Sequence, residues 1–241
     1  MAKKLRAIGV VLSVIGIIAL VASGIAFYRT QQGMNALQKF SEAQNVVLSY
    51  DDDGNLTDRG TTEGADAIME MLEDEWGYPV LNGELDANDP VVNTASEYMF
   101  QMATIVHHVR EGTQTVVLTE DVEYNGETFA AGTYEFDVDG RYWTDFDRQH
   151  PIEGPARSQA WSGTVHGLVG ELGVGVVTHT SIQVGYAMAG MLGAMGLMGL
   201  LTGFALTALG KEPKESKEPE TVLETETILE TEPMDRVLVD A

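Results

Sequence analysis

The chain has 241 residues, with 37 acidic against 14 basic side chains, and its net charge is −23. Such an acidic surface repels phosphate backbones, so we expect no nucleic-acid partner. The chain contains no cysteine, which excludes disulfides, zinc–thiolate sites and thiol chemistry.

The N-terminus combines a short basic segment with a long apolar one. Lys3, Lys4 and Arg6 lie within residues 1–6, and residues 7–28 follow without a charge. A cleavable signal peptide is the competing interpretation, but its apolar core is only about 7–15 residues long. The longer run predicts an uncleaved transmembrane helix over residues 7–28.

A second uncharged segment lies near the C-terminus. Residues 182–209 are almost entirely aliphatic, methionine or glycine. A helix of this length measures roughly 42 Å, which exceeds the bilayer's hydrocarbon core of about 30 Å. We therefore predict a second transmembrane helix over residues 182–209, tilted or partly protruding.

The basic residues predict the orientation in a plasma membrane. Lys3, Lys4 and Arg6 precede the first span, and Lys211, Lys214 and Lys217 follow the second. Residues 29–181 contain 27 acidic but only seven basic residues. The positive-inside rule then places both termini in the cytoplasm and residues 29–181 outside.

The predicted fold class is α+β: two transmembrane helices flank an extracytoplasmic mixed domain with β-hairpins, and an acidic tail, residues 210–241, follows. We expect residues 30–44 to continue the first helix, residues 45–57 to form a hairpin and residues 61–76 a helix capped by Thr61 or Thr62. Asp89-Pro90 predicts a helix to about Arg110. Residues 113–143 read as strands, with a type I′ turn at Asn125-Gly126. Residues 145–157 read as an irregular connection, and residues 158–181 fit a helix, a strand or a loop.

Small residues recur at three- and four-residue steps in both predicted spans. Because small side chains let helix backbones approach closely, these stripes predict helix packing. The helix that packs against each stripe is either the other span of the same chain or a span of a second membrane protein. A second copy of this chain would be such a second protein, and the contact would then be self-association. The predicted packing residues are Gly9, Ser13, Gly16, Gly193, Gly196, Gly199 and Gly203.

Candidate metal sites are few. The run Asp51-Asp52-Asp53-Gly54-Asn55 resembles a calcium loop, but an EF-hand register would place Ser49 and Gly60 at ligand positions, so a turn is favoured. Among the five histidines, His166 and His179 flank Glu171, and imidazole with carboxylate binds zinc or iron. Ordinary structural histidines are the favoured alternative, because no metal-binding spacing is present. We expect no cofactor and no catalytic residue set.

Two stretches resemble a known group of sequences. The run Tyr-Asn-Gly-Glu-Thr-Phe-Ala-Ala-Gly-Thr-Tyr-Glu-Phe at 124–136 and the Gly-Arg-Tyr-Trp at 140–143, on a two-span plan, resemble uncharacterised membrane proteins of actinobacteria. Similar sequences are often labelled aromatic ring-opening dioxygenases. This sequence does not support that label, since it shows no two histidines and a carboxylate at a recognisable iron-binding spacing. The resemblance implies a cell-envelope location and no functional residue.

Three functions follow as hypotheses. The first is a non-enzymatic scaffold or accessory subunit of a cell-envelope complex, embedded in the lipid bilayer with a membrane-protein partner. The second is a metal-binding or metal-dependent site near the outer surface, using His166, Glu171 and His179. The third is a transmembrane sensor whose disordered tail is phosphorylated. Its candidate acceptors are Thr221, Thr225, Thr227 and Thr231.

Overall fold

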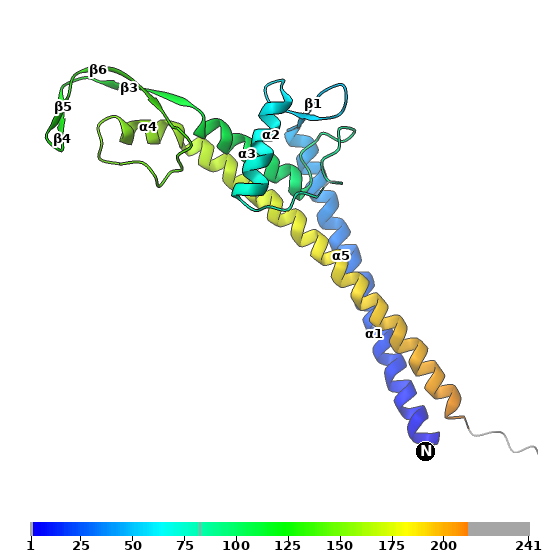
Figure 1. Ribbon diagram of the computed structural model, residues 1–241. Coiled ribbons are helices and arrows are strands. Elements are labelled where there is room, and N and C mark those ends of the chain that lie inside the picture. The colour runs from blue at the N-terminus through cyan, green and yellow to red at the C-terminus, as the bar shows by residue number, and fades with distance from the viewer. Residues whose placement is uncertain (1, 82, 212–241) are drawn as a thin grey trace, which may run out of the picture.

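Two long antiparallel helices form the axis of the molecule. A computed structural model describes residues 2–81 and 83–211. Helix α1 (Ala2–Gln44) has 43 residues and helix α5 (Gly163–Leu209) has 47. They lie side by side over most of their length, and the smaller elements gather around one end of the pair (Figure 1). Both helices are long and apolar enough to cross a membrane.

The ends of these helices follow from local sequence. Asn45 has a positive φ of 52°, and its N–H bonds to the carbonyl of Ser41 at 2.9 Å, which terminates α1. Ser162 is the N-cap of α5, and its hydroxyl accepts from the N–H of Val165 at 3.4 Å. The predicted continuation of the first helix over residues 30–44 is confirmed. The ambiguous segment 158–181 is mostly helix, because α5 begins at Gly163.

The predicted domain boundaries therefore fall inside helices. The boundary between residues 28 and 29 lies within α1, and the boundary between residues 181 and 182 lies within α5. At about 1.5 Å per residue the two helices measure roughly 65 and 70 Å, which is more than the 40–45 Å of a bilayer with its headgroups. Both helices thus extend from the apolar region into the mixed domain, which we call the head (residues 45–162).

Glycines let α1 and α5 touch backbone to backbone. A methyl group on Gly16 would lie 2.7 Å from the carbonyl oxygen of Gly196, and one on Gly9 would lie 2.6 Å from the carbonyl oxygen of Gly203. Farther along the pair, the hydroxyl of Ser23 donates to the carbonyl of Ala189 at 2.8 Å. All seven predicted packing residues lie at this contact within the chain, namely Gly9, Ser13, Gly16, Gly193, Gly196, Gly199 and Gly203.

Part of the head packs directly on α5. Helix α2 (Thr62–Glu70) continues into a π-helical turn, η1 (Met71–Glu75), and helix α3 (Ala95–Arg110) lies against α5. Of the two predicted caps, Thr61 is the N-cap of α2, and Gly77 with φ 65° follows the end of η1. Strands β1 (Ser49–Tyr50) and β2 (Leu56–Thr57) form a small hairpin whose turn is held by the Asp51 carboxylate. Ile68, Leu72, Ala103 and Val138 are completely buried in the core.

The rest of the head is a narrow β-ribbon. Strands β3 (Thr113–Leu118) and β6 (Gly132–Asp137) pair antiparallel, from Thr113 opposite Asp137 to Leu118 opposite Gly132. At the tip, β4 (Val122–Tyr124) and β5 (Glu127–Phe129) pair around Asn125 and Gly126, whose φ angles of 52° and 83° confirm the predicted type I′ turn. The ribbon projects sideways, and helix α4 (Glu153–Ala160) packs against it (Figure 1).

Two local predictions were wrong. The helix expected from Asp89-Pro90 begins at Ala95, because Thr94 and Glu97 form a complete capping box and Val91 pairs with Val47 instead. The connection expected over residues 145–157 contains the start of α4, whose Ala156 is buried under the ribbon with Val116 and Ile152. The predictions on the tail, including its four threonines, concern residues outside the described part.

The glycine contact yields a matched pair of variants. We expect G16A to lower stability by about 1–3 kcal/mol, because the new methyl group meets backbone atoms that cannot rotate away. G24A adds the same methyl group where nothing lies within 4 Å, so it should be neutral or gain up to about 1 kcal/mol from helix propensity. The readout is the temperature at which half of the detergent-solubilised protein remains monodisperse by size-exclusion chromatography. Equal midpoints for the two variants would contradict this contact.

Candidate functional site

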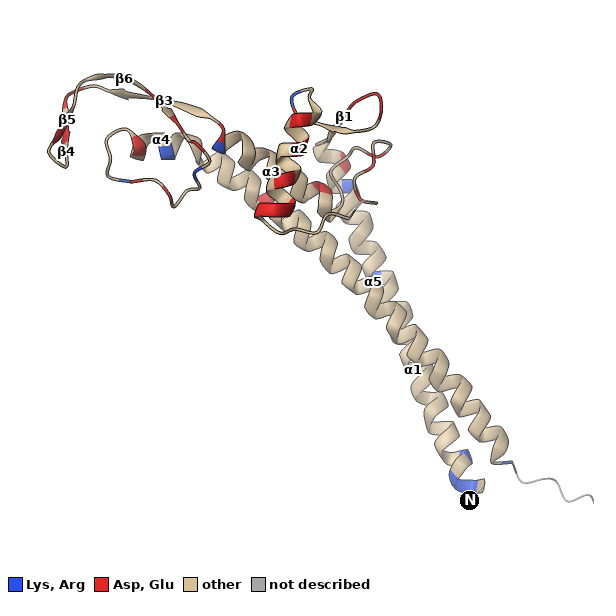
Figure 2. Cartoon of the chain, viewed as in Figure 1, with Lys and Arg blue, Asp and Glu red and all other residues tan. Residues whose placement is uncertain are grey.

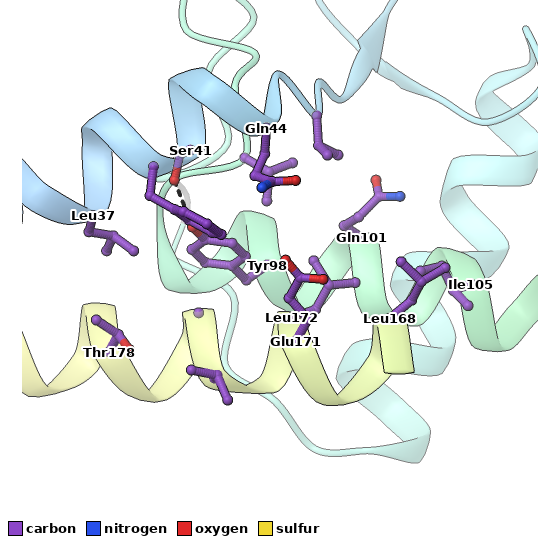
Figure 3. Close-up of a pocket in the computed structure, with 15 residues that line it drawn as sticks. Leu37, Ser41, Gln44, Tyr98, Gln101, Ile105, Leu168, Glu171, Leu172 and Thr178 are labelled. Atoms are coloured by element: carbon purple, nitrogen blue, oxygen red, sulfur yellow. Dashed lines mark hydrogen bonds between the residues drawn. The ribbon is translucent and has the colours of Figure 1, made fainter. Parts of the chain in front are cut away.

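An apolar cavity lies where α1, α3 and α5 meet (Figure 3). Its volume is about 560 Å³. This falls within the range of about 300–1,000 Å³ that is common for small-molecule sites. The lining comes from the last turns of α1, one face of α3, the first turns of α5 and two valines in loops. The lining residues are Leu37, Phe40, Ser41, Gln44, Val46, Val92, Tyr98, Gln101, Ile105, Leu168, Glu171, Leu172, Val174, Gly175 and Thr178.

Tyr98 connects the three helices at the inner wall of the cavity. Its hydroxyl is hydrogen-bonded to the hydroxyl of Ser41 on α1 at 2.7 Å. Its ring lies directly on Gly175 of α5, where a methyl group would come within 2.6 Å of the ring carbons. Both residues are buried, and this hydrogen bond joins α3 to α1. Gly175 is therefore the residue that allows α3 to approach α5 closely enough to close this wall.

The remaining polar groups of the cavity are sparse. Gln44 from α1 and Gln101 from α3 both reach the lining, and Glu171 from α5 is its single charged residue (Figure 3). Glu171 is solvent-exposed and has no ion-pair partner within the described residues. An apolar chamber with one accessible carboxylate at its edge is suited to bind an apolar group that carries a polar or cationic end.

The start of α3 is fixed by an unusually complete set of caps. The buried Glu97 carboxylate accepts from the N–H groups of Asn93 and Thr94 at 2.9 and 2.8 Å, and the N–H of Glu97 itself bonds to the Thr94 hydroxyl. Burial raises the pKa of Glu97 above its ordinary value, although these hydrogen bonds act in the opposite direction. The Glu84 carboxylate accepts from the N–H of Ser96 at 2.9 Å.

His179 supplies the remaining cap from a different helix. It lies on α5 and is only 4% exposed, and its Nδ1 accepts from the N–H of Ala95 at 3.1 Å. Because this nitrogen accepts a hydrogen bond, a neutral ring carries its proton on Nε2. His179 therefore joins the first turn of α3 to α5, about one turn of helix beyond Gly175.

The predicted metal trio is not brought together. His166, Glu171 and His179 all lie on α5, and the outer two are separated by about 20 Å along the helix axis. The His166 ring packs edge-on against Trp143, with centroids 4.9 Å apart. Glu171 faces the cavity, and His179 caps α3. Within residues 2–81 and 83–211, no three His, Asp or Glu side chains form a group that could hold a metal ion, so the metal hypothesis is not supported by the geometry.

A second polar cluster is structural. The guanidinium of Arg110 donates to Glu75 at 2.8 Å and to the carbonyl of Gly140 at 2.7 Å, and it lies over the ring of Tyr142. The Tyr142 hydroxyl in turn accepts from Trp76 and donates to Glu75, both at 2.7 Å. Arg110 and Tyr142 hold the pKa of Glu75 below its usual value. This network attaches the base of the ribbon to η1 and α3.

Comparison of the chain with protein families, with curated proteins and with solved structures finds no significant match. Sequence reasoning did not anticipate the cavity, because its walls come from segments 37–46, 92–105 and 168–178. The only signal in the sequence was the position of Glu171, the last charge before a long uncharged run.

Substitutions of His179 distinguish a helix cap from a metal ligand. We expect H179A to destabilise the protein by about 1–3 kcal/mol, because the buried N–H of Ala95 loses its acceptor. H179N should recover part of that loss, since an amide oxygen can occupy the place of Nδ1. Thermal unfolding in detergent, with and without EDTA, is the measurement. A loss of stability on EDTA treatment, or an equal loss in H179A and H179N, would contradict the capping role.

Proposed function

We propose that this chain is a two-span plasma-membrane protein that holds its acidic head outside the cell and serves as a non-enzymatic accessory subunit or scaffold of a cell-envelope complex. The observation that carries the proposal is the continuity of α1 and α5. Each is a single helix that extends from an apolar segment into the head and lines the cavity there. A head mounted in this way keeps a fixed height and orientation relative to the membrane.

The distribution of charge supports the proposed orientation. The two ends of the helix pair meet, since a methyl group on Gly210 would lie 2.8 Å from the carbonyl of Ala2. Among the described residues, Lys3, Lys4, Arg6 and Lys211 therefore gather at one end of the pair, whereas the described acidic residues lie toward the other (Figure 2). The pair between them is nearly free of charge. Basic residues favour the cytoplasmic side of a membrane.

The exposed face of α5 is the surface on which we expect a partner within the bilayer. The glycine stripes, which suggested such a partner, are occupied by the contact between α1 and α5. Opposite that contact, Met188, Met191, Met195 and Met198 recur every three or four residues, and each is more than half exposed. Methionine side chains adapt to irregular surfaces. This methionine face could contact a second membrane protein or a second copy of the chain.

The orientation can be tested with single cysteines, because the chain has none of its own. We expect N125C, at the tip of the ribbon, to react with a membrane-impermeant maleimide on intact cells. A2C should react only after permeabilisation, because it lies at the opposite end of the helix pair. The readout is maleimide incorporation into the purified protein. The reverse pattern would show that the head faces the cytoplasm.

The partner can be tested by site-specific photo-cross-linking in cells. A photoreactive amino acid at Met191 or Met198 should give a discrete protein adduct, since we place the partner on this face. The same group at Ile18, which is exposed on α1, serves as the matched lipid-facing control and should give none. Purification in mild detergent from cells that were not irradiated should then recover the same partner. Recovery of a lone monomer, with no adduct from either methionine, would refute the accessory-subunit proposal.

A further inference from the structure

We propose that the cavity between α1, α3 and α5 binds the apolar chain of a single-tailed amphiphile from the bilayer, with a cationic amine head group beside Glu171. The inference rests on the proposed insertion of α1 and α5 in a membrane. It does not depend on which side the head faces or on the identity of a protein partner.

An uncharged path connects the predicted span with the cavity. Residues 172–209 of α5 carry no charge, and this segment measures roughly 57 Å, more than the full thickness of a bilayer with its headgroups. Val174 and Val177 lie on this path with 66% and 65% of their surface exposed. On α1, the cavity begins at Leu37, nine residues beyond the end of the apolar run at Tyr28, or about 13 Å. The hydrocarbon tail of an amphiphile can therefore pass from the bilayer edge to the cavity along α5.

Glu171 is the first charged residue that such a chain meets on α5. It lines the cavity, is exposed, and has no ion-pair partner among the residues that the structure describes. Residues 29–181 around it are strongly acidic, so a carboxylate or phosphate head group would be repelled and an ammonium group attracted. Gln44 and Gln101 offer further hydrogen-bonding groups to the same head group.

The head group must provide the selectivity. Lipid chains in the bilayer are already in an apolar environment, so moving one into the cavity gains little from the hydrophobic effect. Preferential binding of one amphiphile over another therefore depends on the electrostatic attraction between its head group and Glu171. A partly exposed ion pair contributes at most about fivefold in an equilibrium constant. The proposal thus predicts a modest but specific preference for an amine over an uncharged head group.

The chain's own C-terminal segment is not a suitable occupant. It follows Gly210, which lies beside Ala2 at the far end of the helix pair. With α1 and α5 in a membrane, Gly210 lies on the side opposite to the cavity.

The test uses the full-length protein in nanodiscs of phosphatidylcholine. The probes are hexadecylamine, hexadecanol and hexadecanoic acid, each with a diazirine in the middle of the chain and an alkyne at its end. After irradiation, adducts are mapped by mass spectrometry. We expect the amine to label segments 37–46, 98–105 and 168–178 about fivefold more than the alcohol, with the acid lowest. E171Q should abolish the preference and leave labelling by the alcohol unchanged.

Two tryptophan variants control for the cavity itself. I105W places an indole inside the lining and should reduce labelling of the three segments by all probes. V117W places the same group on an exposed position of β3, away from the lining and from the path along α5, so labelling should persist. L168W repeats the cavity-filling test if I105W is not monodisperse. Equal labelling by amine and alcohol in the unmodified protein, or equal labelling in the filled and control variants, would overturn the proposal. Neither result would affect the partner cross-linking, so the two proposals can fail separately.

Discussion

The backbone contact between α1 and α5 is the constraint on which the rest of the molecule depends. Gly9 and Gly16 meet Gly203 and Gly196 so closely that one added carbon would overlap carbonyl oxygens. At such separations, dispersion and local hydrogen bonds such as Ser23 to Ala189 hold the helices together. The contact aligns the two helices along their length, so they enter the head as a pair.

The head is built on this pair. Helix α3 is attached to α5 by the His179 cap at its first turn and by the Tyr98 ring on Gly175 one turn later. The same tyrosine is bonded to Ser41 at the end of α1. Three helices therefore share one junction, and the cavity is the space left on its outer side. A displacement of either long helix would alter the cavity walls directly.

The charge pattern separates two kinds of surface. The helix pair is apolar and exposed, with side chains such as Ile18, Leu201 and Phe204 more than 60% accessible, whereas most acidic residues of the described part lie on the head (Figure 2). Exposed apolar surface of this extent is unfavourable in water and favourable in lipid. Inside the head, the acidic groups that are buried or clustered are satisfied locally: Glu97 by backbone N–H groups and Glu75 by Arg110 and Tyr142.

Local features were determined by the sequence alone. Two uncharged runs predict the two long helices, Thr61 predicts the start of α2, and Asn125-Gly126 predicts the type I′ turn, because each depends on neighbouring residues or on composition. Where two local signals competed, tertiary contacts decided. Pro90 and the Thr94–Glu97 box are two such local signals, and the pairing of Val91 with Val47 left only the second, so the helix begins at Ala95. Likewise, a histidine on an uncharged helix could be a ligand or a core residue. Only the packing of α3 on α5 made His179 a helix cap, and only that packing created a cavity beside Glu171 from three distant segments.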